Sequence, residues 1–254
     1  MWAGGAILGG LMGAGAIAIH LPRATHLLIA GVVFSAVVLI AYPYLLRGPD
    51  HDDHPSARSA DGGGAGAGVY ATLLALVVIA IAGATVEDAG SSWATLYLRD
   101  SLGAPGAVAV FGYIALVGFM FIGRMIGDRL VDRFGERAVV RTGGFVTAAG
   151  MGAALAFPSV PGTIAGFAAA GLGVATLVPA AMHGADQLPG MSPGTGLTVV
   201  TWLMRVGFFG APILVGFVAD ATSLRVGLLS VPVAGVVAMA LAVVLSARRL
   251  PTRS

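Results

Sequence analysis

At residues 123–137 the chain reads Gly123-Arg124-Met125-Ile126-Gly127-Asp128-Arg129-Leu130-Val131-Asp132-Arg133-Phe134-Gly135-Glu136-Arg137. Seven charged side chains gather here, where the apolar residues 107–127 give way to the apolar residues 139–157. A helix needs roughly 20 apolar residues to cross the hydrocarbon core of a bilayer. We therefore predict that this stretch closes one transmembrane helix and opens the next after a short loop.

The same length criterion divides the rest of the chain into further apolar segments, separated by turns rich in Pro and Gly. It predicts an all-α polytopic bundle of about eight spans, at residues 2–20, 26–46, 69–98, 107–127, 139–157, 161–184, 195–219 and 225–247. Gly5, Gly9 and Gly13 recur every four residues in the first of these, a spacing that lets another helix approach closely.

The composition agrees with a membrane protein. Of the 254 residues, 57% are hydrophobic and 10% are charged, whereas soluble domains carry about 25% charged residues. Such a chain must bury its surface in membrane lipid. The net charge of +2 argues against a nucleic-acid partner, which requires a basic stripe.

Missing residue types exclude several kinds of chemistry. The chain has no Cys, and all fourteen basic residues are Arg. Thiolate zinc sites, cysteine nucleophiles, P-loops and Schiff-base lysines are therefore excluded. The motifs H-E-x-x-H and G-x-S-x-G and a metal-ligand cluster within a span are also absent, so we predict no enzyme, no cofactor and no metal. Asp50-His51-Asp52-Asp53-His54 could hold a metal, but a cluster in a flexible linker is more simply solvated.

The one long hydrophilic stretch is residues 47–68, which is rich in Asp, His, Ser and Gly and lacks periodicity. It reads as a flexible linker between two spans in residues 1–46 and six spans in residues 69–254. Nine arginines fall on the linker side of the predicted spans and three on the opposite side. The positive-inside rule then places the linker and both termini in the cytoplasm.

Polar residues within spans are the functional candidates, because lipid makes them costly. In the third span Asp88, Ser91, Ser92 and Thr95 share one helix face, with Glu87 at its edge. This face would line a cavity or pack on another polar helix. The competing reading is that the two carboxylates lie at the interface and are merely solvated. Tyr113, in the fourth span, fits a cavity or ordinary packing equally well.

The seventh span repeats this pattern with Thr198, Thr201, Trp202 and Arg205. Arg205 falls near the middle of the bilayer, where a lone Arg costs at least ~2.5 kcal/mol. It therefore needs a carboxylate, a cavity or an anionic substrate. Glu87 and Asp88 are the carboxylates available in the membrane, although their depth does not match. A structural ion pair without a substrate role is the alternative.

The stretch at 123–137 resembles the loop motif of the major facilitator superfamily: Gly, three residues, Asp-Arg, any residue, Gly, then two basic residues. Asp132, Arg133, Gly135 and Arg137 match, whereas Glu136 replaces one basic residue. The leading Gly is displaced by one position, so that the candidate motif comprises Gly127, Asp128, Arg129, Asp132, Arg133, Gly135 and Arg137. We expect Asp132 to cap a helix and to pair with Arg across the loop, as a conformational latch.

Other segments support the resemblance. Gly210-Ala211-Pro212 looks like the Gly/Pro-rich eleventh span of that family. Glu87-Asp88 with Trp93 and Tyr97 is similar to the seventh span of its sugar-permease-like branches. The chain looks like spans five to twelve of a twelve-span transporter, with six spans after the linker and two before it.

The resemblance implies secondary transport of a small solute across the cell membrane by alternating access. Glu87 or Asp88 could carry a coupling proton, and Arg205 with Trp202 could contact the substrate. Two alternatives stay open. The first is a truncated or partner-dependent fragment, lacking an N-terminal half and unable to transport alone. The second is a membrane-embedded enzyme, which the absence of catalytic motifs disfavours.

Overall fold

The computed structural model describes residues 21–41 and 66–245, and within these ranges the chain is all-α and contains no strand. Seven helical segments are long and apolar enough to cross a membrane, which confirms the predicted fold class of a polytopic helix bundle. The predicted first span at 2–20, and with it the Gly5, Gly9 and Gly13 spacing, lies outside the described residues. So do most of the linker at 47–68 and the Asp50–His54 cluster.

The described helices fall into two units, which separate between α2 and α3. The first unit contributes α2 (Arg23–Ala41), which is strongly apolar beyond its polar first turn and suited to burial in lipid. The second unit contains the other six spans.

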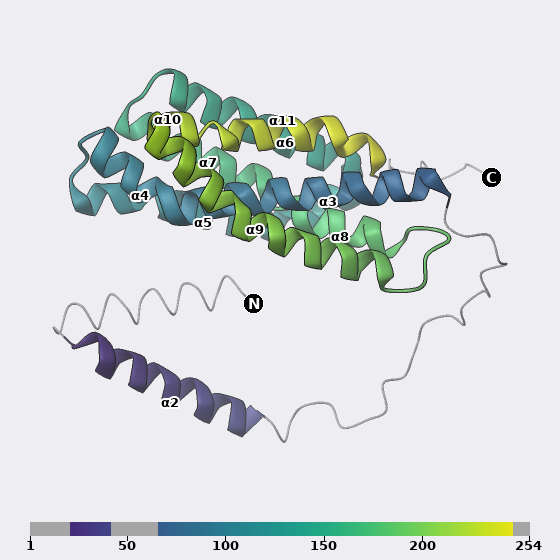
Figure 1. Cartoon of the computed structure of the whole chain (residues 1–254), viewed down its shortest axis with the longest axis horizontal. Coiled ribbons are helices and arrows are strands. Elements are labelled where there is room, and N and C mark those ends of the chain that lie inside the picture. Colours follow the sequence, from purple (N-terminus) through teal and green to yellow (C-terminus); the bar gives the residue numbers. More distant parts are fainter. Residues whose placement is uncertain (1–20, 42–65, 246–254) are drawn as a thin grey trace. The chain divides into compact units, whose positions relative to one another are not determined.

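Six spans form the larger unit (Figure 1). Their elements are α3 (Ala67–Asp88), η2 (Ala89–Trp93), α4 (Ala94–Leu96), η3 (Tyr97–Ser101), α5 (Gly106–Phe134), α6 (Glu136–Ala156), α7 (Val160–Val174), α8 (Leu177–Asp186), α9 (Thr195–Ala221), α10 (Leu224–Gly227), α11 (Ser230–Leu241) and η4 (Ala242–Val244).

The chain order of these helices is not their order in space. α7 packs between α5 and α6, α6 packs on α11, and α3 packs on α11, α8 and α9. The spans of α3 and of α7–α8 are therefore the most buried, while α9 lies at the outside of the unit. The start of α3, the loop from α8 to α9 and the end of α11 gather at one end of the bundle, and α4 and α10 lie at the other (Figure 1).

Glycines set the closest contacts between helices. A Cβ placed on Gly143 of α6 would collide with the carbonyl oxygen of Gly173 in α7, and one on Gly144 would lie 2.6 Å from the carbonyl oxygen of Gly235 in α11. Lipid tails are as apolar as Leu, so membrane helices associate through close packing and not through the hydrophobic effect. Small residues at these crossings allow that packing.

Two spans change their helical geometry where the sequence becomes polar or contains Pro. α3 continues into a π-helix at Ala89–Trp93, directly after Glu87 and Asp88. The predicted sixth span breaks between α7 and α8 at Ala175 and Thr176. Pro179 cannot donate a hydrogen bond to the carbonyl four residues earlier, which belongs to Ala175 and lies at that break.

The polar stretch at 123–137 is more helical than the sequence predicts. α5 continues through it to Phe134, and α6 begins at Glu136. Gly135 alone makes the turn, with φ of +83°, a conformation that Gly adopts without a steric penalty. Hydropathy marks where the chain leaves the apolar region, but a helix with charged side chains can extend beyond that point.

Candidate functional site

An ion pair links the third and fourth predicted spans inside the bundle. Glu87 lies in the last turn of α3, and its Oε2 is 3.6 Å from Nη2 of Arg124 in α5. The side chains are 20% and 33% exposed, respectively. Arg124 precedes the end of α5 by ten residues, or about 15 Å at 1.5 Å per residue. Arg124 therefore lies well inside α5, which is longer than the predicted span at 107–127.

Asp88 lies beside this pair and is almost fully buried, with 6% of its surface exposed. Its Oδ1 accepts a hydrogen bond of 3.0 Å from the hydroxyl of Ser92. Its Oδ2 is buried and has no hydrogen-bond partner within the described part of the chain. The π-helix that begins at Ala89 follows this residue directly, and such turns are frequent at functional sites.

Trp93 ends that π-helix and points toward α9. A Cβ on Gly216 would lie 3.4 Å from the indole ring, so the ring packs on the glycine face of α9. The indole Nε1 is buried, and no acceptor reaches it among the described residues. Glu87, Asp88, Ser92 and Trp93 thus form one polar group at the junction of α3 and η2.

A cavity of about 460 Å³ lies between the ends of α5, α6 and α8, and Arg124 contributes to its wall. Its other charged or titratable lining residues are Asp128, Asp132, Glu136 and His183. Glu136 is only 11% exposed, and its Oε1 lies 3.7 Å from Nε2 of His183. Arg124 therefore connects the polar group inside the bundle with a hollow at its end.

The predicted polar face of α9 points out of the six-span unit. Trp202 is 69% exposed, Arg205 is also exposed, and the hydroxyl of Thr201 donates to the carbonyl of Leu197 in its own helix. Arg205 forms no ion pair within residues 21–41 and 66–245. The direct pair with Glu87 that the sequence suggested is absent there, since Glu87 pairs with Arg124.

The motif residues at the α5–α6 turn take separate positions. Gly127 is buried against Thr176, whereas Asp128, Arg129, Asp132 and Arg133 are exposed. The side chain of Asp132 does not cap α6, whose first turn lacks a side-chain cap. Arg133 lies 5.5 Å from the ring centre of Phe134. Arg137 instead donates to the carbonyls of Val243 and Leu245, at 2.6 and 3.1 Å.

Tyr113 lies on the exposed side of α5, apart from the polar group at the end of α3.

Sequence reasoning missed Arg124 as the partner of Glu87. Which residues of α3 and α5 lie side by side depends on how the two helices pack, and the local sequence pattern does not determine this. Sequence reasoning also passed over Glu136. The signal that could have drawn attention to Glu136 was its acidic side chain at a motif position where the family has a basic residue.

Comparison with known proteins relates the chain to membrane transporters. It is 35% identical over 165 residues to membrane protein MosC of Rhizobium meliloti, covering 65% of this chain and 40% of the relative. It is 28% identical over 226 residues to the transporter y4wD of Sinorhizobium fredii, covering 89% of this chain and 58% of the relative. An MFS-type transporter of Yersinia pestis is 26% identical over 251 residues, with 97% and 62% covered.

The resemblance to the major facilitator superfamily is confirmed by these relatives, and they and the seven apolar helices show a multi-pass membrane protein. The chain spans 40% to 62% of the length of the three curated relatives. No family model matches it, and no solved structure matches it.

Proposed function

We propose that this chain, as a relative of major-facilitator-type transporters, takes part in moving a small solute across the cell membrane by alternating access, with proton coupling. The observation that carries the proposal is the polar group at the end of α3. Asp88, Glu87 and Trp93 lie together in the candidate span of α3, and Glu87 pairs with Arg124 in the candidate span of α5. Ionisable groups at such depth are costly and mark substrate, ion or proton pathways.

Asp88 is the better candidate for the proton carrier. Glu87 has a cationic partner, which stabilises its charged form. Asp88 has only the hydroxyl of Ser92 within hydrogen-bond reach, and its other oxygen is unpaired within the described residues. A buried carboxylate without a cation is costly to keep charged. Asp88 can therefore take up and release a proton when its access to water changes.

The outward face of α9 supplies candidate substrate contacts. An Arg in a membrane span does not face lipid cheaply, yet Arg205 and Trp202 point out of the six-span unit. These side chains would line a water-filled path along α9 and attract an anionic or polar solute. The alternative is that transport depends on a partner: another membrane segment would have to cover the outward face of α9 before the chain could transport.

Reconstitution of the full chain in liposomes loaded with a pH-sensitive dye tests this proposal. A panel of organic acids, sugars and amines is added outside, and both solute uptake and internal pH are recorded. We expect one solute class to acidify the interior in a protein-dependent manner. Asp88→Asn should abolish the pH change, and Arg205→Ala should weaken uptake without lowering the yield of folded protein.

The tested outcomes separate the alternatives. A folded chain that moves none of the panel favours the partner-dependent function. Normal proton-coupled uptake by Asp88→Asn would remove Asp88 from the pathway. Arg99→Ala, which removes an exposed arginine outside both the proposed path and the loop motif, is the matched control and should behave like the unchanged chain.

A further inference from the structure

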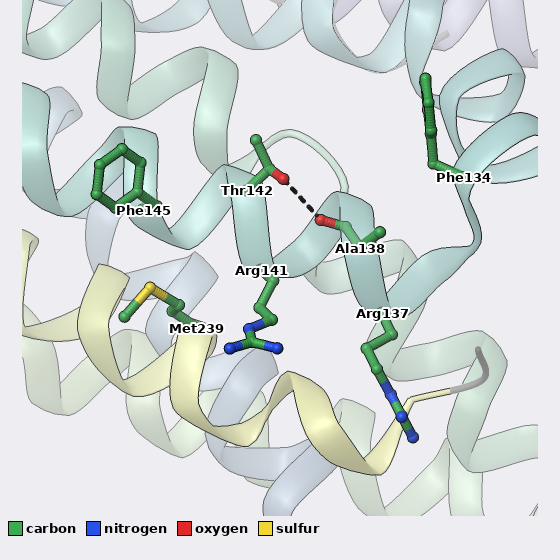
Figure 2. A pocket seen from close by; sticks show the side chains of 7 residues that line it. All are labelled: Phe134, Arg137, Ala138, Arg141, Thr142, Phe145 and Met239. Carbon is green, nitrogen blue, oxygen red and sulfur yellow. Dashed lines mark hydrogen bonds between the residues drawn. The ribbon is translucent and has the colours of Figure 1, made fainter. Parts of the chain in front are cut away.

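A groove on the outside of the six-span unit holds two arginines among apolar side chains. It encloses about 490 Å³ beside α6 and α11 and is lined by Phe134, Arg137, Ala138, Arg141, Thr142, Phe145 and Met239. A smaller hollow of about 260 Å³ adjoins it and shares Arg137, Arg141 and Met239. Figure 2 shows both arginines extending from the same side of α6 toward α11.

The groove carries two positive charges that no described residue in its lining neutralises. Neither hollow has a carboxylate in its lining. Arg137 uses Nε and Nη2 to hold the last carbonyls of the α11–η4 span, which leaves Nη1 available. Arg141 is exposed and forms no hydrogen bond or ion pair with any described residue. Arg137 and Arg141 are four residues apart in α6, so their side chains start from the same face of the helix, and an anion bound between them would contact both.

A mostly apolar hollow continues from this groove. It encloses about 380 Å³ between α5, α6 and α7 and shares Phe134, Ala138 and Thr142 with the groove. None of its lining residues is charged. The surface thus offers a cationic part and an apolar part side by side, which is the pattern that an amphiphile with an anionic head requires.

The depth of the groove in the membrane agrees with such a ligand. Arg141 follows the start of α6 by five residues, or about 8 Å at 1.5 Å per residue. Because the predicted span begins at residue 139, we place Arg141 near the boundary between headgroups and acyl chains and Phe145 one turn deeper. The sequence adds Arg248 and Arg249 a few residues after Leu245 and has no acidic residue after Asp220.

We infer that this groove binds an anionic phospholipid, with its phosphate on Arg141 and Arg137 and an acyl chain in the apolar hollow. Basic recesses between transmembrane helices are suited to anionic headgroups. A free phosphate ion would gain nothing from Phe145 or the apolar hollow. A zwitterionic lipid would bring its own cation close to the arginines.

Native mass spectrometry of the full purified chain tests the inference. The delipidated protein is mixed with equal amounts of phosphatidylglycerol and phosphatidylcholine of the same acyl chains, and bound lipid is counted. We expect a clear preference for phosphatidylglycerol. Arg141→Gln should lower the preference for phosphatidylglycerol about fivefold, because one Arg near an anionic surface contributes about 1 kcal/mol of binding free energy. Arg141→Lys keeps the positive charge and should retain most of the preference.

The matched control is Arg129→Gln, which removes the same charge from an exposed position outside the groove and should keep the preference. Equal binding of both lipids by the unchanged chain would overturn the inference. So would an equal loss in Arg129→Gln, which would indicate net charge alone. Displacement of phosphatidylglycerol by inorganic phosphate at millimolar concentration would reveal an ion site and would also overturn it. Circular dichroism checks that every variant remains helical.

Discussion

At the residue scale, the Glu87–Arg124 pair makes a prediction about stability. Removing one partner of a buried ion pair leaves an uncompensated charge in the membrane, with a cost of roughly 3–5 kcal/mol when burial is complete. Arg124 is one-third exposed, which lowers that cost. We expect Arg124→Ala to reduce the melting temperature in detergent, and Glu87→Gln in the same chain to restore part of it.

Arg205→Ala with Glu87→Gln is the matched comparison, because Arg205 does not pair with Glu87 in the structure. Here the second change should restore nothing. If the two changes at Glu87 and Arg124 are simply additive, then the pair contributes no coupling energy and the carboxylate is solvated in solution.

The same residues show what sequence can supply at this scale. Polarity within an apolar span was enough to select Glu87 and Asp88 as candidates. Their partners depend on the axial position of α3 relative to α5, which is set by the packing of the whole bundle. Arg124 was therefore treated only as part of the polar stretch at 123–137, and Arg205 was considered as a partner although α9 presents it outward.

At the element scale, glycine contacts between helices make the next prediction. Gly143→Ala should weaken the α6–α7 crossing, because the added methyl group collides with the backbone of Gly173 and not with a movable side chain. Overpacking of this kind typically costs about 1–3 kcal/mol. Gly118→Ala in α5 meets nothing within 4 Å and is the control. Melting temperatures of the two variants are compared. A loss no greater for Gly143→Ala would show that the helices move apart without penalty.

The positions of the helices were largely predictable, and their ends were not. Runs of apolar residues located seven described spans, because a bilayer imposes a minimum length. The extension of α5 to Phe134 was not predicted, since its polar side chains resemble those of a loop. The π-helix at Ala89–Trp93 was not predicted either, although it directly follows the polar residues Glu87 and Asp88. Hydropathy indicates which residues contact lipid, whereas the backbone hydrogen bonds of a helix can continue past the last of these residues. Helix ends are therefore not fixed by hydropathy.

At the scale of the whole molecule, hydrogen bonds between distant segments fix which helix ends lie together. Arg137, just after the α5–α6 turn, binds the carbonyl of Leu245 at the end of the last span. Arg225 binds the carbonyl of Leu155 at the opposite end of the bundle. The spatial order of the helices could not be derived from sequence, but these two contacts agree with the alternating direction that the spans require.

The arginine distribution predicts which end of the bundle faces the cytoplasm. Arg129, Arg133, Arg137 and Arg141 lie near the α5–α6 turn, while Arg99 and Arg225 lie toward the other end. Positive side chains are retained on the cytoplasmic side during insertion. The α5–α6 turn, the start of α3 and the end of the last span should therefore be cytoplasmic. Alkaline phosphatase fused at residue 60 or after Ser254 should be inactive, and green fluorescent protein at these positions should fluoresce.

A fusion after Ser159, between α6 and α7, is the matched control for this topology. It lies one span away from the α5–α6 turn, so it should give the opposite result, with active phosphatase and no fluorescence. Active phosphatase at residue 60 together with inactive phosphatase at 159 would invert the whole bundle. The anionic lipid groove beside Arg141 would then face the outer leaflet, and the cavity that contains Glu136 and His183 would open to the outside. Matching activity at all three positions would contradict the alternation of spans itself.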